Sequence, residues 1–273
     1  MSQSNLRKPS VSGQFYPSDP GTLLGLITSF AVKVAQKQDV IGCLLPHAGY
    51  VYSGKVATQT ISGVNIKDTV ILLGPNHSGN GPDFSLMSQG YWQTPLGNIE
   101  IDSQLANLFL SNSRYLKADT FAHVEEHSLE VELPILQYFK KDFKIVPISI
   151  KADKLNILKV VAEELVEVIT RNDLIDSSMF IASSDMTHYE SQQSAAKKDA
   201  LAIEAIVALD EDKLEEVVRR LSISMCGLAP VVVLIRVAKL LGAKNGKLIK
   251  YQTSGDATGD TSSVVGYAGI TIY

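Results

Sequence analysis

The sequence predicts an α/β fold, in which a central sheet that is mainly parallel, or mixed, is flanked by helices. Short apolar runs rich in β-branched residues alternate along the chain with segments of helical period. Such alternation is typical of parallel strands that are connected by helices. By length, 273 residues would suit one or two domains, but no linker, repeat or low-complexity tract divides them. We therefore expect a single domain over residues 1–273.

The expected elements follow from this pattern in chain order. Buried strands are expected at residues 40–45, 70–73, 144–150, 179–183 and 264–272, and helices at 21–38, 155–170, 193–209, 212–221 and 228–241. Asp19 and Pro20 form an N-cap and N1 signature before the first helix. Glycines and short alternating runs predict a β-hairpin within 83–101. Residues 254–263 are expected to form an ordered turn before the last strand.

Composition excludes several classes of function. The net charge of −4 gives no electrostatic support for binding nucleic acid. The most apolar stretch, residues 228–243, contains Arg236 and Lys239 and is too short to cross a bilayer. The polar start has no secretory signal, and two cysteines cannot form a disulfide framework. We therefore expect a cytoplasmic protein that binds neither nucleic acid nor a membrane.

Three of the five histidines follow the expected buried strands. His47 comes after residues 40–45, His77 after 70–73 and His188 after 179–183. In open α/β sheets, ligands bind beyond the carboxyl ends of the strands. A single histidine in such a place is usually a surface or hydrogen-bonded loop residue, but three equivalent positions favour a shared site.

The two cysteines have different surroundings. Cys43 lies inside an expected strand and is interpreted as a small buried apolar residue. Cys226 lies directly before the helix expected at 228–241, where the helix dipole favours a thiolate. A thiolate is both a nucleophile and a metal ligand, so Cys226 is a candidate for either role.

A competing motif lies at residues 123–127. His123, Glu126 and His127 match the His-x-x-Glu-His pattern of inverted zinc proteases, in which two histidines on one helix face bind zinc. A third ligand is not evident downstream, and Pro134 would distort a helix there. We therefore expect His123 to be a solvated residue at the start of a helix.

Five ordered motifs resemble the Memo family, whose prokaryotic members are called AmmeMemoRadiSam system protein B. The resemblance extends from Arg7 to the last strand. Its motifs are Pro46-His47-Ala48-Gly49-Tyr50, Leu73-Gly74-Pro75-Asn76-His77, Glu126-His127-Ser128-Leu129-Glu130, Ser183-Ser184-Asp185-Met186-Thr187-His188-Tyr189 and Met225-Cys226-Gly227.

The resemblance implies the fold of class III (LigB-type) extradiol dioxygenases, which hold non-haem Fe(II) with two histidines and a glutamate. Matched by motif, the metal ligands here would be His47, His77 and Cys226, with Asp185 and His188 lining the same pocket. The family also implies association with a radical-SAM protein and an AMMECR-type protein.

The expected function is a metal-dependent oxidoreductase holding one transition-metal ion, Fe(II) or copper. A thiolate ligand favours Cu(I) or zinc over Fe(II), so a zinc hydrolase is an alternative. His188 would be the general acid or base, and Asp185 would orient His188 or a bound water. His127 and Tyr52 would contact the substrate. The other alternative is a non-catalytic module that binds a small molecule, a peptide or a partner protein.

Overall fold

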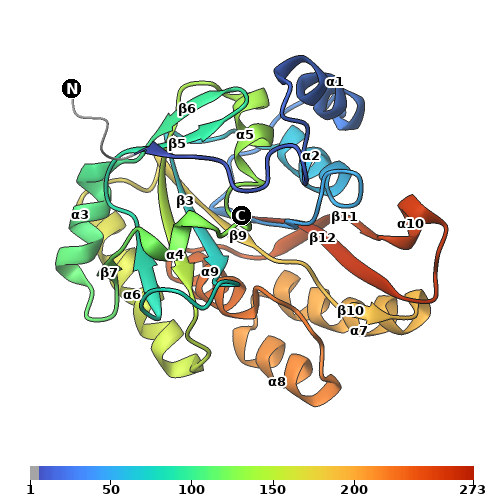
Figure 1. Ribbon diagram of the computed structural model, residues 1–273. Coiled ribbons are helices and arrows are strands. Elements are labelled where there is room, and N and C mark those ends of the chain that lie inside the picture. Colours follow the sequence, from blue (N-terminus) through green and yellow to red (C-terminus); the bar gives the residue numbers. More distant parts are fainter. Residues whose placement is uncertain (1–5) are drawn as a thin grey trace.

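A mixed β-sheet runs through the computed structural model, which describes residues 6–273 (Figure 1). At its centre lie four mutually parallel strands in the order β2 (Gly42–Leu45), β9 (Ser178–Ser183), β3 (Thr69–Pro75) and β8 (Lys144–Ile150). β12 (Val264–Ile272) is antiparallel to β2. All five are strands that the sequence predicts, and the α/β class with a mixed sheet is confirmed.

Shorter strands extend the sheet and form a second one. β4 (Phe84–Leu86) and β7 (Lys117–Ala118) continue it beyond β8, while β10 (His188–Glu190) and β11 (Gly246–Thr253) both pair with β12. The predicted hairpin is formed by β5 (Tyr91–Thr94) and β6 (Gly97–Glu100). It makes a separate three-stranded sheet with β1 (Leu6–Arg7).

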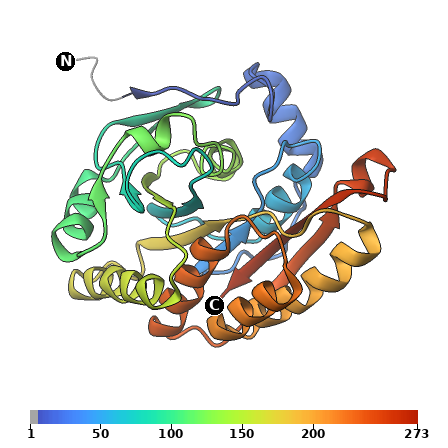
Figure 2. The same cartoon turned by 60° about the horizontal axis from the view of Figure 1, so that its bottom comes forward.

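Helices cover both faces of the main sheet (Figure 2). One face carries α6 (Leu155–Arg171), α7 (Gln192–Val207), α8 (Glu211–Leu221) and α9 (Leu228–Leu240), all close to their predicted bounds. The other carries α1 (Pro20–Phe30), α2 (Gly54–Ser62) and α5 (Leu133–Phe139). Among the remaining helices, α3 (Ser103–Asn112) packs on α6, and α4 (Phe121–Val124) and α10 (Gly255–Thr258) are single turns.

The first helix is shorter than the sequence predicts. It ends at Phe30 rather than at residue 38, because the following residues leave to pair with the segment after α2. Gln38 donates its backbone N–H to the Gly63 carbonyl and accepts one from Asn65. The helical periodicity of the sequence therefore continues beyond Phe30, although the backbone there makes its hydrogen bonds with a distant part of the chain.

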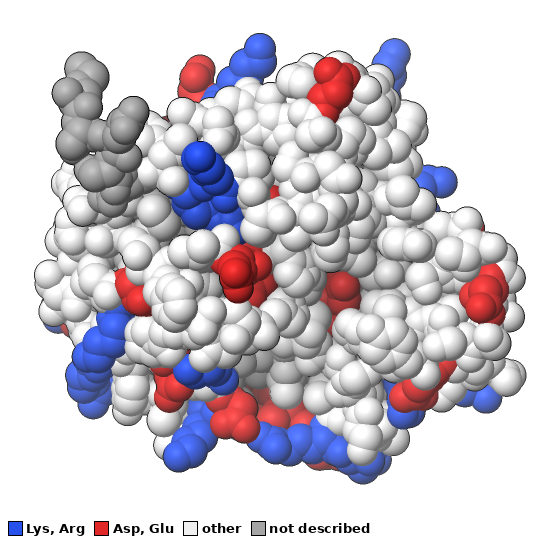
Figure 3. Space-filling model, viewed as in Figure 1, with Lys and Arg blue, Asp and Glu red and all other residues white. Residues whose placement is uncertain are grey.

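The surface has charges of both signs. On the face shown in Figure 3, acidic and basic side chains are interspersed, and no broad basic surface is visible there. No helix in the described part of the chain is both long and apolar enough to cross a membrane.

A buried ion pair joins the N-terminal segment to the loop before α5. The Arg7 guanidinium donates to the Glu130 carboxylate, and both side chains are almost completely buried. Arg7 also donates to the carbonyls of His123 and Glu126, and lies over the Trp92 ring. These bonds fix the path of the loop from its start to Glu130.

Glu130 accepts hydrogen bonds from several further donors: the backbone N–H groups of Ser10 and Val11 and the hydroxyls of Ser10 and Tyr16. Burial alone would raise the pKa of Glu130, but Arg7 and these donors outweigh it and hold the pKa below its usual range. The carboxylate is therefore ionised in the folded protein.

Replacing Arg7 with Met should lower the free energy of unfolding by about 3 kcal/mol, because the change leaves Glu130 buried without its counter-ion. The measurement is urea denaturation followed by circular dichroism. Arg171→Met is the matched control, since Arg171 pairs with Glu167 on the surface and exposed pairs contribute little. Equal losses in the two variants would contradict this role for Arg7.

The same contact predicts how stability varies with pH. A carboxyl whose pKa is lower in the folded state stabilises the protein above its unfolded pKa, and this contribution is lost as pH falls through the folded value. The free energy of unfolding should therefore decrease below about pH 4.5, and less steeply in Glu130→Gln than in the wild type. Identical slopes in denaturation series at pH 3–6 would contradict the assignment.

Candidate metal centre

The three predicted ligands converge at one edge of the sheet. The ligand atoms of His47, His77 and Cys226 all lie within 4.8 Å of one another. His47 and His77 follow the carboxyl ends of β2 and β3, and these strands flank β9. Parallel register thus brings residues thirty positions apart to the same edge, and Cys226 joins them from the turn before α9.

His47 is held from two sides. Its backbone N–H donates to the Asp185 carboxylate at 2.9 Å, and its Nδ1 lies 2.8 Å from the Ser183 hydroxyl at the end of β9. Nε2 is left facing Cys226 Sγ at 3.3 Å. The ring is buried, and burial lowers its pKa well below the ordinary value, so His47 is neutral and its Nε2 can act as a ligand.

His77 is held by a buried carboxylate. Glu126 accepts from the His77 backbone N–H at 2.6 Å and lies 2.9 Å from its Nδ1. Burial of Glu126 opposes ionisation, but its bonds to His77 and to the Ser128 N–H lower its pKa to about 2. A carboxylate on the distal nitrogen of a ligand histidine fixes the ring orientation and makes the other nitrogen a better ligand.

Cys226 is positioned by its neighbour Gly227. A Cβ at Gly227 would lie 2.3 Å from the Ser183 carbonyl and 2.5 Å from Ser184 Cβ, so the turn can pass this close to β9 only with glycine. The Asp185 backbone N–H points at Cys226 Sγ from 3.2 Å.

The protonation state expected for Cys226 is wrong for the metal-free protein. Burial, with a further contribution from the Asp185 charge, raises the thiol pKa to about 12. Desolvation of a thiolate thus outweighs the dipole of α9, and Cys226 is a thiol unless a cation replaces the proton. Cys43 is fully buried in β2, as predicted.

The structure places the two predicted catalytic residues beside the ligands. Asp185 contacts the His47 backbone, and burial raises its pKa to about 7. His188 begins β10, and its backbone N–H donates to the hydroxyl of Ser224, two residues before Cys226. Its Nδ1 is buried and has no hydrogen-bond partner among the described residues.

The two predicted substrate-binding residues differ in their distance from the ligands. His127 stacks on His77 with ring centroids 4.9 Å apart, and its centroid lies 5.5 Å from that of His47. Tyr52 lies in the turn before α2, is 38% exposed, and accepts a hydrogen bond at its carbonyl from Gln252.

The expectation that His123 is solvated is wrong. Its side chain is fully buried beside Trp92, and its Nε2 lies 3.1 Å from the Ser85 carbonyl. Because α4 ends at Val124, the two histidines of the His-x-x-Glu-His pattern do not share one helix face. His127 instead joins His77 and Glu126 in a second close group, so the geometry of an inverted zinc protease is not formed.

Sequence reasoning gave Glu126, Ser183 and Glu132 no role in holding the ligands in place. Glu126 belongs to a quoted motif, but only the structure shows that it contacts His77. Ser183 ends a predicted strand, and Glu132 lies behind it at 2.9 Å. The spacing of Glu126, Glu130 and Glu132 in a largely apolar segment was the available signal, since buried carboxylates require partners.

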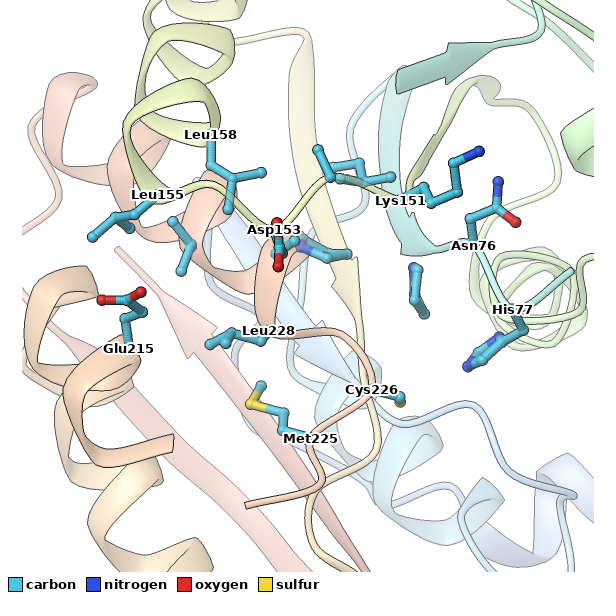
Figure 4. A pocket seen from close by; sticks show the side chains of 16 residues that line it. Asn76, His77, Lys151, Asp153, Leu155, Leu158, Glu215, Met225, Cys226 and Leu228 are labelled. Atoms are coloured by element: carbon cyan, nitrogen blue, oxygen red, sulfur yellow. The ribbon is translucent and has the colours of Figure 1, made fainter. Parts of the chain in front are cut away.

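A pocket of about 380 Å³ opens beside His77 and Cys226 (Figure 4). His77 and Cys226 lie at one end, and Leu155, Leu158 and Glu215 lie across from them. Its walls are mainly apolar side chains from the ends of β3 and β8 and from α6 and α9. Such a volume is in the range of small-molecule sites.

Comparison with known proteins identifies the family of this chain. A family model described as Memo-like protein matches residues 7–271. MEMO1 family proteins of Methanopyrus kandleri, Aquifex aeolicus and Nitrosopumilus maritimus are 42%, 41% and 38% identical, and each alignment covers 97% of this chain and 98% of the relative. An uncharacterized protein from Escherichia coli K12 of known structure superposes with a TM-score of 0.49 and 11% identity, over 83% of this chain and 98% of that one.

The match extends over almost the whole chain and includes all three candidate ligands. The chain therefore belongs to the Memo-like protein family.

Proposed function

We propose that the chain is a metal-dependent oxidoreductase whose single metal ion is held by His47, His77 and Cys226. The observation that carries the proposal is the convergence of two imidazole nitrogens and one sulfur within 4.8 Å. The Nε2–Sγ separation of 3.3 Å is close to the edge of about 3.5 Å that tetrahedral coordination with ordinary metal–nitrogen and metal–sulfur bonds requires.

The donor set fits a transition metal. Three protein ligands leave at least one coordination position for a substrate, as in catalytic metal sites generally. Fe(II) or copper bound there would supply one-electron redox chemistry, whereas zinc would supply a Lewis acid for hydrolysis. We propose iron or copper and keep zinc hydrolysis as the competing outcome, because the thiolate also suits zinc.

The residues around the ligands can move protons. Asp185, with a pKa of about 7, can exchange a proton near neutral pH, which is what a general acid or base requires. His188, whose buried Nδ1 has no hydrogen-bond partner among the described residues, would be the second group that exchanges a proton with a bound substrate. His127, stacked on His77, would restrict how that substrate approaches.

A binding module is the second candidate function. The apolar pocket beside His77 and Cys226 could hold a small molecule without turnover, or part of a peptide. The radical-SAM and AMMECR-type proteins that the family resemblance implies would be partners of such a module. Ligand binding that persists without metal and without oxygen consumption would favour this candidate.

Metal content tests the ligand assignment. Protein purified without a histidine tag should contain about one transition-metal ion per chain by mass spectrometry, and His47→Ala/Cys226→Ala should contain almost none, because two of three ligands are lost. Cys43→Ala is the matched control, since Cys43 is the other cysteine and is buried in β2. Metal retained by the double variant would overturn the assignment.

Glu126→Gln should weaken metal binding by about 10–100-fold, because the amide cannot orient and polarise His77 as a carboxylate does. Competition with a chromophoric chelator measures the affinity. Glu125→Gln, a change at the exposed neighbouring position, should leave it unaltered. If both variants bound metal as tightly as the wild type, Glu126 would have no role at the metal.

Turnover distinguishes the candidate functions. Metal-free protein reloaded with Fe(II), copper or zinc should consume oxygen in the presence of a catechol panel only with iron or copper. His188→Gln should lose this turnover while retaining its metal, because it lacks the proton-exchanging nitrogen. Hydrolysis of ester substrates with zinc alone, and no oxygen consumption, would replace the oxidoreductase with the hydrolase.

A further inference from the structure

A buried hydrogen-bond network lies behind His47, on the side away from Cys226. At its centre, the Ser183 hydroxyl lies 2.8 Å from the Ser128 carbonyl, 2.9 Å from Glu132 Oε1 and 2.8 Å from His47 Nδ1. Ser183, Ser128 and Glu132 are fully buried and His47 is 2% exposed. These groups must therefore satisfy one another.

Counting hydrogens assigns the direction of each bond. A serine hydroxyl has one hydrogen and two lone pairs. The Ser128 carbonyl can only accept, so the hydrogen of Ser183 is directed to it. Both lone pairs of Ser183 then remain to accept, and the two other neighbours, Glu132 and His47, must donate.

Donation by Glu132 requires a protonated carboxyl group. The surroundings agree, because Glu132 Oε2 has no partner among the described residues, and a buried carboxylate would leave that charge unsatisfied. Burial also raises the pKa of Glu132 well above its ordinary value. Glu126 and Glu130 are equally buried, but they have His77 and Arg7 beside them. Glu132 differs from them in lacking such a partner among the described residues, not in its burial.

Donation by His47 requires the hydrogen on Nδ1, which leaves the Nε2 lone pair free. That lone pair faces Cys226 Sγ, where the ligand atoms converge. The same arrangement suits the metal-free protein, since the Cys226 thiol can donate its hydrogen to Nε2 at 3.3 Å.

We propose that Glu132 is a positioning residue: as a neutral carboxylic acid it donates to Ser183, and Ser183 in turn holds His47 in the tautomer whose Nε2 is free to bind metal. The functional consequence of this positioning rests on the proposed metal site, but the His47 tautomer is a property of the protein without metal. Groups that hydrogen-bond a metal ligand without touching the metal commonly alter metal affinity by tenfold or more.

The tautomer is measured by ¹⁵N NMR of metal-free protein labelled at histidine. Only five histidines contribute, and His47→Gln identifies the His47 signals. The wild type should show His47 protonated at Nδ1. Ser183→Ala and Glu132→Met should populate the Nε2-protonated form, because the acceptor for Nδ1–H is removed in one and loses its fixed orientation in the other.

Two controls separate positioning from a general loss of packing. Glu132→Gln keeps a donor of the same shape and should retain the wild-type tautomer. Ser149→Ala removes another fully buried serine, one whose hydroxyl has no partner among the described residues, and should have no effect. Circular dichroism shows which variants fold, and Glu132→Gln keeps the test usable if Glu132→Met does not.

Metal affinity and infrared spectroscopy complete the experiment. Zinc affinity by chelator competition should fall about tenfold or more in Ser183→Ala and Glu132→Met, and stay within about twofold in Glu132→Gln and Ser149→Ala. The infrared difference between wild type and Glu132→Gln should contain a carboxylic acid band and no carboxylate band.

Three results would overturn the proposal: His47 protonated at Nε2 in the wild type, a carboxylate band for Glu132, or an unchanged tautomer in folded Glu132→Met and Ser183→Ala. These outcomes are separate from the test of the metal site. If the tautomer responds as expected but the wild type binds no metal, the positioning role stands and the proposed function fails.

Discussion

Three buried glutamates in one seven-residue segment are the constraint on which the site depends. Glu126, Glu130 and Glu132 lie in a loop that is buried against the ends of β3 and β9, and each is 0–1% exposed. A buried carboxyl group destabilises a fold unless it is paired, hydrogen-bonded or neutral. Each of the three glutamates is compensated by a different partner or by protonation. Each set of contacts connects a different part of the chain to the site.

Glu130 is neutralised by Arg7, and this pair connects the N-terminal segment to the loop. Arg7 also binds the His123 and Glu126 carbonyls, so the loop can take only one path. Given that path, Glu126 meets the backbone and ring of His77, and Glu132 meets Ser183 behind His47. The N-terminal strand, far from the ligands in sequence, thus contributes to their geometry without contacting them.

The sequence predicts the central elements well, because each of the five buried strands is a short run rich in β-branched residues. It also predicts three residues whose ligand atoms converge, since His47 and His77 follow such runs and Cys226 precedes an apolar helix. It missed α2, whose Ser53 makes no side-chain cap bond, and β11, whose exposed edge mixes polar and apolar residues. The local sequence therefore does not indicate α2 or β11. Both elements form through contacts with the distant strand β12.

The same limit explains the errors at His123 and Cys226. A pattern of residue types specifies which groups are present, but their protonation depends on desolvation, which only the packed structure determines. His123 is buried under Trp92 and its pKa falls to about 4, while burial raises that of the Cys226 thiol to about 12. Both groups are therefore neutral, one within the core and one at the site.

Neutrality at the site is also what a metal-binding role requires. Without metal, a thiolate near the Asp185 carboxyl would add a buried charge with no cation beside it among the described residues, whereas a thiol facing the free lone pair of His47 does not. A cation entering between His47, His77 and Cys226 would replace the thiol proton and supply the missing positive charge. The surroundings that keep Cys226 protonated without metal therefore make its thiolate depend on a bound cation. Binding of a metal there would release one proton.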